Sequence, residues 1–440
     1  MTIYGIPEAH TLTAAIVGRE LDKAEAREYF ARAAWTSLAE PGDRLANVVV
    51  RELGADGAFA ALIDKWDVAR FAEALGGVAT ADDLEQATAR WMPRLDSSAI
   101  VRALKQGVRF GARLLVPGDE LWPATLNDLG DNAPLALWTR GTDEALASFG
   151  RSIALVGARA ATGYGEHVTM EASAGLVDRG YTIVSGAAYG IDGMAHRAAL
   201  ASNGLTVAFL AGGVDRFYPS GHDALLTRIV ETGAVIAELP CGASPTKWRF
   251  LQRNRLIAAV SQATIVLEAG WRSGSLNTAG HASQLGRPLG AVPGPITSAA
   301  SAGCHRLIRD YGAVLVTSPD EMAELAPFDA PQLDGARADE EVITVTEPAS
   351  ADPLPAAPSP EEPDPDAAEP TRPVRTDDRT RLLDSVSDRS PRAAKDIAKR
   401  AGFSVVAAQA LLGVLELEGV VEERERGWVR PKPKTERGLL

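Results

Sequence analysis

A basic stretch with aromatic residues between its cations runs from residue 247 to residue 255. It contains Lys247-Trp248-Arg249-Phe250 and, two residues later, Arg253-Asn254-Arg255. This alternation suits single-stranded nucleic acid, because aromatic faces stack on bases while Lys and Arg neutralise phosphates. The competing interpretation is a solvated helix start whose Trp248 or Phe250 belongs to the core. The stretch is therefore a candidate polyanion site.

Four turns rich in glycine and small residues follow apolar runs of strand length. Backbone N–H groups of such a turn, next to a helix start, can approach an anion, and an arginine adds a charged fork for phosphate. None matches the GxGxxG or P-loop pattern, so neither a dinucleotide nor a nucleoside triphosphate is indicated. The alternative is a set of ordinary tight turns. The candidate contacts in three of them are Gly157, Arg159, Ser185, Gly186, Gly190, Ser273, Gly274 and Ser275.

A reaction centre is not indicated by these patterns. Asp192 and His196 are spaced to share one helical face and could pair, but no nucleophile accompanies them. The two cysteines, Cys241 and Cys304, have no CxxC spacing, which argues against a zinc site built on cysteine pairs. We therefore expect no catalytic residue, no metal and no cofactor.

Short β-type runs alternate with helical segments from residue 151 onward. Most are continuous apolar runs, which are typical of strands buried on both faces of a parallel sheet. Strand–helix repetition of this kind predicts a doubly wound α/β domain, in which ligands bind at the carboxyl ends of the strands. The glycine turns lie at these ends. The predicted strands are Ser152–Val156, Thr182–Val184, Thr206–Leu210, Ala234–Glu238, Thr264–Glu268, Leu289–Val292 and Ala313–Val316.

The chain of 440 residues is too long for one core, and its composition divides it. Residues 327–370 contain ten prolines, twelve of the 58 acidic residues and one of the 45 basic residues. The net charge of −13 therefore resides mainly there, since the remainder holds 44 basic and 46 acidic residues. Such a composition predicts a disordered, extended linker that leaves the following module without a fixed position. We expect helices over 1–110, the α/β domain over 111–326, the linker over 327–372 and a small domain over 373–432.

The small C-terminal domain has the outline of a winged helix. Pro391–Arg400 and Ser404–Glu418 are the predicted helices, and Val420–Arg430 is the predicted wing. A helix-turn-helix is typical of DNA-reading proteins. The second helix, however, holds no Lys or Arg, so sequence-specific groove binding is not expected. We predict a protein-contact module instead.

In their order and spacing, these motifs resemble the DprA (Smf) family of DNA-processing proteins across residues 112–325. The resemblance implies an extended Rossmann-like sheet, preceded by a small all-helical SAM-like domain. It also implies single-stranded DNA binding, a homodimer, and delivery of the recombinase RecA to that strand during natural transformation. The runs that carry it are VGAR…GYG, SGAAYGIDGMAH, GGVDRFYP, AELPCG, FLQRNRLIAAVS, EAGWRSGSLNTA, VPG and AGCHRLI.

The family's DNA-contacting motifs map onto this chain residue by residue. Arg159 stands at the position of the arginine in the family's Gly-Ser-Arg motif, and Ala158 stands in place of the serine. Phe250, Arg253, Asn254 and Arg255 match Phe-x-x-Arg-Asn-Arg, and Ser185, Gly186 and Gly190 match Ser-Gly-x-x-x-Gly-Ile-Asp. Ser220 and His222 stand where the family often has lysine and asparagine, which weakens the case for contacts from that loop. With Lys247 and the turn Ser273–Ser275, these residues form the predicted DNA site.

The expected dimer contact lies near the last strand, where Leu307, Ile308 and Leu315 are predicted to be exposed. The alternative for these residues is plain core packing.

We expect a cytoplasmic protein without membrane contact. No apolar run approaches a membrane span, the N-terminus lacks the pattern of a secretory signal, and two cysteines fit a reducing compartment.

Two other classes of function stay open. A Rossmann enzyme that cleaves nucleoside monophosphates would need a Pro-Gly-Gly-x-Gly-Thr loop, which Ala269–Thr278 lacks. A winged-helix transcription regulator would need a charged second helix.

Overall fold

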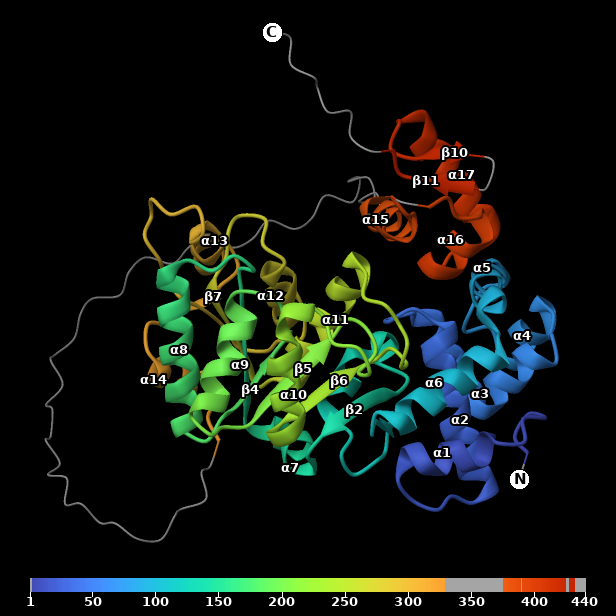
Figure 1. Ribbon diagram of the computed structural model, residues 1–440, viewed down its shortest axis with the longest axis horizontal. Helices are drawn as coiled ribbons and strands as arrows, with labels where there is room; N and C mark the ends of the chain where they lie inside the picture. The colour runs from blue at the N-terminus through green and yellow to red at the C-terminus, as the bar shows by residue number, and fades with distance from the viewer. Residues whose placement is uncertain (1, 329–374, 389, 425–426, 432–440) are drawn as a thin grey trace, which may run out of the picture.

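The computed structural model describes residues 2–328, 375–388, 390–424 and 427–431 (Figure 1). Residues 329–372 of the predicted linker lie outside the described residues. The fold class is confirmed: a helical N-terminal region is followed by a large mixed sheet with helices on both faces, and by a winged helix.

The N-terminal region up to residue 109 is built mainly of helices. Carboxylate and hydroxyl side chains begin most of these helices, and Asp22 forms a capping box with Glu25 at the second. Pro41 and Gly42 separate the second and third helices. The helices are α1 (Ala9–Val17), α2 (Lys23–Leu38), α3 (Arg44–Ile63), α4 (Val68–Ala74), α5 (Ala81–Trp91) and α6 (Ser97–Arg109).

A nine-stranded sheet forms the centre of the molecule, with strand order β1-β2-β6-β5-β4-β3-β7-β8-β9. The seven predicted strands are present as β3 to β9 and pair in parallel. The two antiparallel edge strands, β1 and β2, were not predicted. The strands are β1 (Arg113–Leu115), β2 (Leu137–Gly141), β3 (Ser152–Gly157), β4 (Thr182–Ser185), β5 (Thr206–Leu210), β6 (Ala234–Ala237), β7 (Ala263–Glu268), β8 (Leu289–Ala291) and β9 (Val314–Leu315).

Alternate residues of the central strands enter cores on opposite faces of the sheet. Ile153 and Leu155 of β3 pack with α8 and α9, whereas Ala154 and Val156 face the side of α11 and α12. Figure 1 shows α8, α9 and α10 side by side along one face. The helices are α7 (Asp143–Ala147), α8 (Gly163–Asp178), α9 (Ile191–Ala201), α10 (Asp223–Thr232), α11 (Lys247–Val260), α12 (Ser275–Gln284), α13 (Ala302–Asp310) and α14 (Pro319–Glu324).

The N-terminal helices share one core with the near edge of the sheet. Trp138 of β2 is fully buried among them, and its indole N–H donates to Thr36 Oγ1 at 3.2 Å. The helical region is therefore packed firmly on the α/β domain.

The C-terminal module contains three helices and a two-stranded wing around Leu382, Ile397, Leu412 and Trp428. Its first helix, α15, was not predicted, whereas the next two helices and the wing lie where the sequence placed them. The elements are α15 (Arg375–Ser385), α16 (Ala394–Ala401), α17 (Val405–Leu417), β10 (Glu422–Arg424) and β11 (Gly427–Val429).

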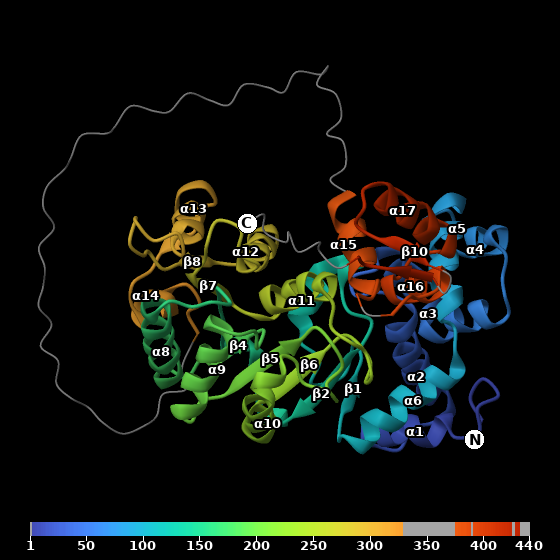
Figure 2. The ribbon, with the colours of Figure 1, turned by 45° about the horizontal axis from the view of Figure 1, so that its top comes forward.

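The winged helix occupies a definite position, contrary to the expectation of a freely placed module. Helix α15 lies beside α11 in both views, and α16 approaches the N-terminal helices (Figures 1 and 2). Side-chain contacts between distant parts of the chain account for this docking. They could not be inferred from the composition of the linker.

Among the described residues, no single helix is both long and apolar enough to cross a membrane. The pair α16 and α17 passes that test of length and composition only when joined across a bend of 106°.

Candidate nucleic-acid interface

The turns that follow β3 and β4 are in direct contact. The N–H of Ile191, at the start of α9, donates to the carbonyl oxygen of Ala158 at 3.1 Å. Gly190 has a positive φ of 74°, and a Cβ there would collide with the carbonyl oxygens of Ala158 and Arg159. Gly190 is thus required by the approach of two backbones, and this approach fixes where the exposed Arg159 leaves the sheet.

The helix start after β3 is already occupied by a carboxylate of the protein. Glu268, at the end of β7, accepts from the N–H of Thr162 at 2.9 Å and from its hydroxyl at 2.6 Å. Thr162 in turn caps α8 by accepting from the N–H of Gly165. Glu268, which is 2% exposed, therefore takes the place that an external anion would need at the N–H of Thr162.

In the turn after β4, a carboxylate of the protein likewise accepts from a backbone N–H. Asp192 is buried and accepts from the N–H of Ala188. Burial raises the pKa of Asp192, and the nearby Arg253 guanidinium opposes the rise. His196 contacts Thr206 Oγ1 at 2.7 Å and does not pair with Asp192. Ser185 donates to the carbonyl oxygen of Leu155, so it too has a structural partner.

Arg253 is a buried connector between α11 and the two neighbouring strands. Its guanidinium donates to the carbonyl oxygen of Gly186 at 2.7 Å and to that of Phe209. Burial lowers the pKa of Arg253 to about 10, although Asp192 opposes the shift. A Cβ at Gly186 would collide with this guanidinium, which explains the glycine. Predicted as a DNA contact, Arg253 is instead placed to hold the turn after β4 against α11.

Arg255 and Asn254 also differ from the prediction of direct DNA contact. Both terminal nitrogens of Arg255 donate to Glu238 at 2.7 Å, and its Nε donates to the carbonyl oxygen of Asn132. Only 3% of the Arg255 side chain is exposed. The Asn254 amide donates to Asn277 Oδ1 at 3.1 Å and so ties α11 to α12.

The residues left on the surface form a small cluster of cations and rings. Arg159 lies over the ring of Phe250, with its Cζ 5.1 Å from the ring centroid. Tyr218 packs on the same ring, with centroids 5.7 Å apart and planes at 57°. Lys247, one turn before Phe250 on α11, is exposed. We call Arg159, Tyr218, Lys247 and Phe250 the ring–cation cluster.

Two exposed tyrosines were missed as site residues. Tyr218 is 53% exposed and Tyr189 is 50% exposed. Tyr189 packs on His222, which is itself buried and contacts the carbonyl oxygen of Ala187. The usable signal was their position in the turns after β4 and β5, because aromatic residues at a strand's carboxyl end that do not enter the core are available for stacking.

The turn Ser273–Ser275 borders the same region through Asn254, whose amide also reaches the carbonyl oxygen of Gly274 at 3.4 Å. Helix α12 begins at Ser275, and its N-cap residue, Gly274, has no side chain to cap it. Ser273 and Ser275 instead bond to each other through their hydroxyl groups.

The predicted dimer residues fall into two groups. Leu307 is 4% exposed and belongs to the core, so its predicted exposure is wrong. Ile308 is partly buried against the same core. Leu315 is 50% exposed on β9, which among the described strands pairs only with β8 and therefore forms an edge of the sheet. Leu307 also lines a cleft of about 290 Å³ between α12 and α13.

Within the described ranges, no group of three or more His, Cys, Asp or Glu residues is arranged to hold a metal ion. Cys241 and Cys304 are free and buried.

Comparison with known proteins identifies the family. Residues 113–327 match the family described as DNA recombination-mediator protein A, and residues 354–425 match the DprA winged helix domain. The second match begins earlier than the predicted boundary at residue 373, and residues 354–374 lie outside the described residues.

Two relatives illustrate the similarity. A DNA processing protein DprA of Mycobacterium tuberculosis is 52% identical over 227 residues, which make up 49% of this chain and 58% of that protein. The match therefore spans little more than half the length of the mycobacterial relative. DprA of Streptococcus pneumoniae is 40% identical over 48% of this chain and 72% of its own length.

Among solved structures, the X-ray structure of DprA from Streptococcus pneumoniae is similar, with a TM-score of 0.56 at 29% identity. The match covers 69% of this chain and 99% of the chain in the Streptococcus pneumoniae structure. The chain described here belongs to the DprA family of DNA-processing proteins.

Proposed function

We propose that this protein binds single-stranded DNA with little sequence preference and delivers RecA to it during natural transformation. The observation that carries the DNA part is the ring–cation cluster. Arg159 and Lys247 offer charge to phosphates, while Tyr218 and Phe250 offer ring faces to bases. The RecA part, the protection of incoming DNA and a cytoplasmic location rest on the family.

In the glycine turns, side chains of the protein itself accept hydrogen bonds from backbone N–H groups. This favours DNA binding by base stacking and phosphate contacts over recognition of base edges by hydrogen bonds. Glu268 and Asp192 already occupy donors of the turns after β3 and β4. N–H groups that already donate to a carboxylate of the protein cannot also donate to a base edge. We also propose no catalytic step, because these two carboxylates are buried and engaged in structural hydrogen bonds.

A titration across salt concentrations tests this function. The protein is titrated into random-sequence single strands and into the corresponding duplex, and binding is followed by fluorescence anisotropy. The salt concentration is varied from about 50 to about 200 mM. We expect tighter binding to the single strand, with an affinity that falls as salt rises because phosphate contacts release counterions. Preference for duplex, or an affinity independent of salt, would refute the proposal. Delivery of RecA is measured separately, as RecA assembly on a strand covered by single-strand-binding protein.

Tyr218→Ala is expected to weaken single-strand binding by about 1–3 kcal/mol if the ring stacks on a base. Half of the side chain is exposed, so its removal should leave the stability of the fold nearly unchanged. The matched control is Phe110→Ala, which removes an exposed ring that also lies near two arginines, at the end of α6. Equal losses in both variants would contradict the assignment.

We propose that β9 mediates a homodimer, because an edge strand offers unpaired backbone groups and Leu315 and Val314 are both about half exposed on it. Leu315→Asp should convert the dimer to monomer, since a charge would be buried at the contact. Light scattering at tens of micromolar protein, roughly the concentration at which weak dimers appear, measures the oligomeric state. Val406→Asp on α17 is the control. A wild-type protein that is monomeric there, or a dimeric Leu315→Asp variant, would count against the proposal.

A further inference from the structure

The winged helix places a carboxylate on the first turn of the helix that carries the ring–cation cluster. Asp384, near the end of α15, accepts from the backbone N–H of Lys247 at 2.7 Å. The Asp384 side chain is 12% exposed, and Arg430 beyond the wing lies 3.9 Å from its other carboxylate oxygen. Asp384 is therefore oriented by its own module toward α11.

Helix α11 does not need this carboxylate to cap its N-terminus. Its N-cap, Thr246, already accepts from the N–H of Arg249 at 3.3 Å. The N–H of Lys247 is one of the first-turn donors that no intrahelical partner can satisfy, and it lies at the positive end of the helix. Such a donor suits a phosphate as well as a carboxylate.

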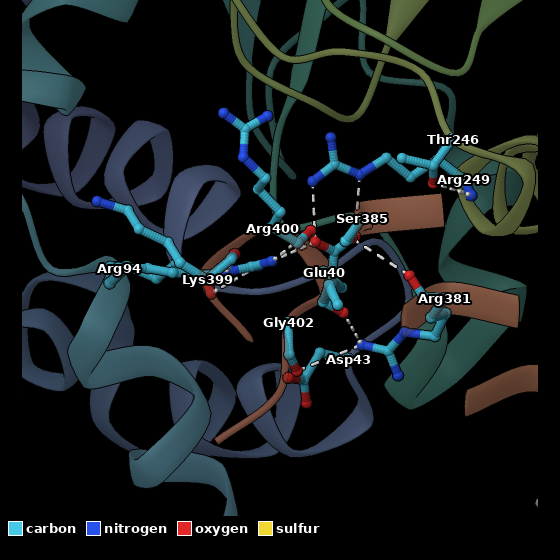
Figure 3. A network of polar contacts seen from close by, with 12 residues as sticks. Glu40, Asp43, Arg94, Thr246, Arg249, Arg381, Ser385, Lys399, Arg400 and Gly402 are labelled. Atoms are coloured by element: carbon cyan, nitrogen blue, oxygen red, sulfur yellow. Dashed lines mark hydrogen bonds and ion pairs between the residues drawn. The ribbon is translucent and has the colours of Figure 1, made fainter. Parts of the chain in front are cut away.

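A buried cluster around Glu40 holds the module in this position, as Figure 3 shows. Glu40 accepts from Arg249 of α11 at 2.9 and 3.1 Å, and from Arg94 at 2.5 Å. Arg94 also donates to the carbonyl oxygen of Lys399 in the winged helix at 2.8 Å. Arg381 of α15 completes the contact, with its Cζ 5.0 Å from the ring centroid of Trp248.

The charge of Glu40 persists at neutral pH. Burial would raise its pKa, but Arg249 and Arg94 outweigh burial and hold the pKa well below its usual value of 4.5. A carboxyl with a lowered pKa stabilises the folded state fully above its unfolded pKa and loses this effect only as pH falls below it. Protons therefore do not release the winged helix near pH 7.

The docked module meets the expected path of DNA along α11. Lys247 and Phe250 are three residues apart and so lie on neighbouring turns of one helical face. A strand that stacks on Phe250 and continues toward the start of α11 would bring a phosphate to the N–H that Asp384 occupies. Two anions cannot share one donor, and they repel each other.

We propose that the winged helix is an inhibitory cover, in which Asp384 takes the place of a phosphate at the start of α11 until DNA displaces it. This inference rests on the proposed single-strand binding. It makes the module a brake on DNA binding that is built into the fold.

The test compares Asp384→Ala with Asp396→Ala in the full chain. Both variants remove one negative charge from the winged helix, but Asp396 is exposed on α16 and, unlike Asp384, does not accept from the N–H of Lys247. We expect Asp384→Ala to bind a random single strand about threefold to tenfold more tightly at low salt, with a smaller gain at high salt because the competition is electrostatic. Asp396→Ala should bind like the wild type.

Hydrogen exchange of α15 supplies a readout that does not depend on affinity. Asp384→Ala, and saturating DNA on the wild type, should each speed exchange in α15. Faster exchange in the variant with unchanged or weaker DNA binding would overturn the cover while leaving the proposed function intact. If the wild type and both variants fail to bind single strands, the proposed function fails, and the cover with it.

Discussion

Arg255→Met is expected to lower the free energy of unfolding by about 3–5 kcal/mol, because it leaves the buried carboxylate of Glu238 without its partner. The guanidinium donates twice to Glu238 at 2.7 Å, and the two side chains are 3% and 11% exposed. Folded Arg255→Met protein should still bind single-stranded DNA with an affinity close to that of the wild type, since Arg255 does not reach the surface.

Denaturant unfolding and anisotropy titration measure the two quantities. Arg287→Met is the control, because its partner Asp128 is 55% exposed, so that solvent screens the pair and it should contribute about 1 kcal/mol or less. If Arg255→Met does not fold, the double variant with Glu238→Leu should recover most of the stability, because it removes the unpaired charge. A stable Arg255→Met variant with weakened DNA binding would show that Arg255 is a DNA contact after all.

Arg159→Ala should show the opposite pattern. A charge-assisted phosphate contact is worth about 1–3 kcal/mol, so single-strand affinity should fall by about fivefold to 150-fold. Stability should change little, because the Arg159 side chain is exposed and makes no hydrogen bond or ion pair with any other described residue. Its contact is the face of Phe250.

The control for Arg159 is Arg197→Ala, which removes one exposed positive charge from α9. It should reduce affinity only slightly, through the net charge. Equal losses in the two variants would mean that overall charge, and not a site at the end of β3, attracts DNA. An unchanged affinity in Arg159→Ala at moderate salt would refute the placement of the site.

The parallel part of the sheet could be predicted because burial on both faces leaves a local trace. Continuous apolar runs of strand length, separated by helical periodicity, appear within a few residues of each strand. Strands β1 and β2 left no such trace. They are short, pair in antiparallel fashion at one edge, and bury Trp138 against the N-terminal helices.

The sequence by itself determined the fold class, the family and the stretch that carries the cations, because these depend on residue types and on spacing along the chain. Tertiary structure decided which cations remain free. Arg253 and Arg255 look as available in the sequence as Arg159, yet Gly186 and Glu238 meet them only after α11 packs on the sheet. Likewise, Asp384 meets the N–H of Lys247 across 137 positions. Contacts between such distant positions leave no periodicity or local composition to detect, since they arise only when separate elements pack together.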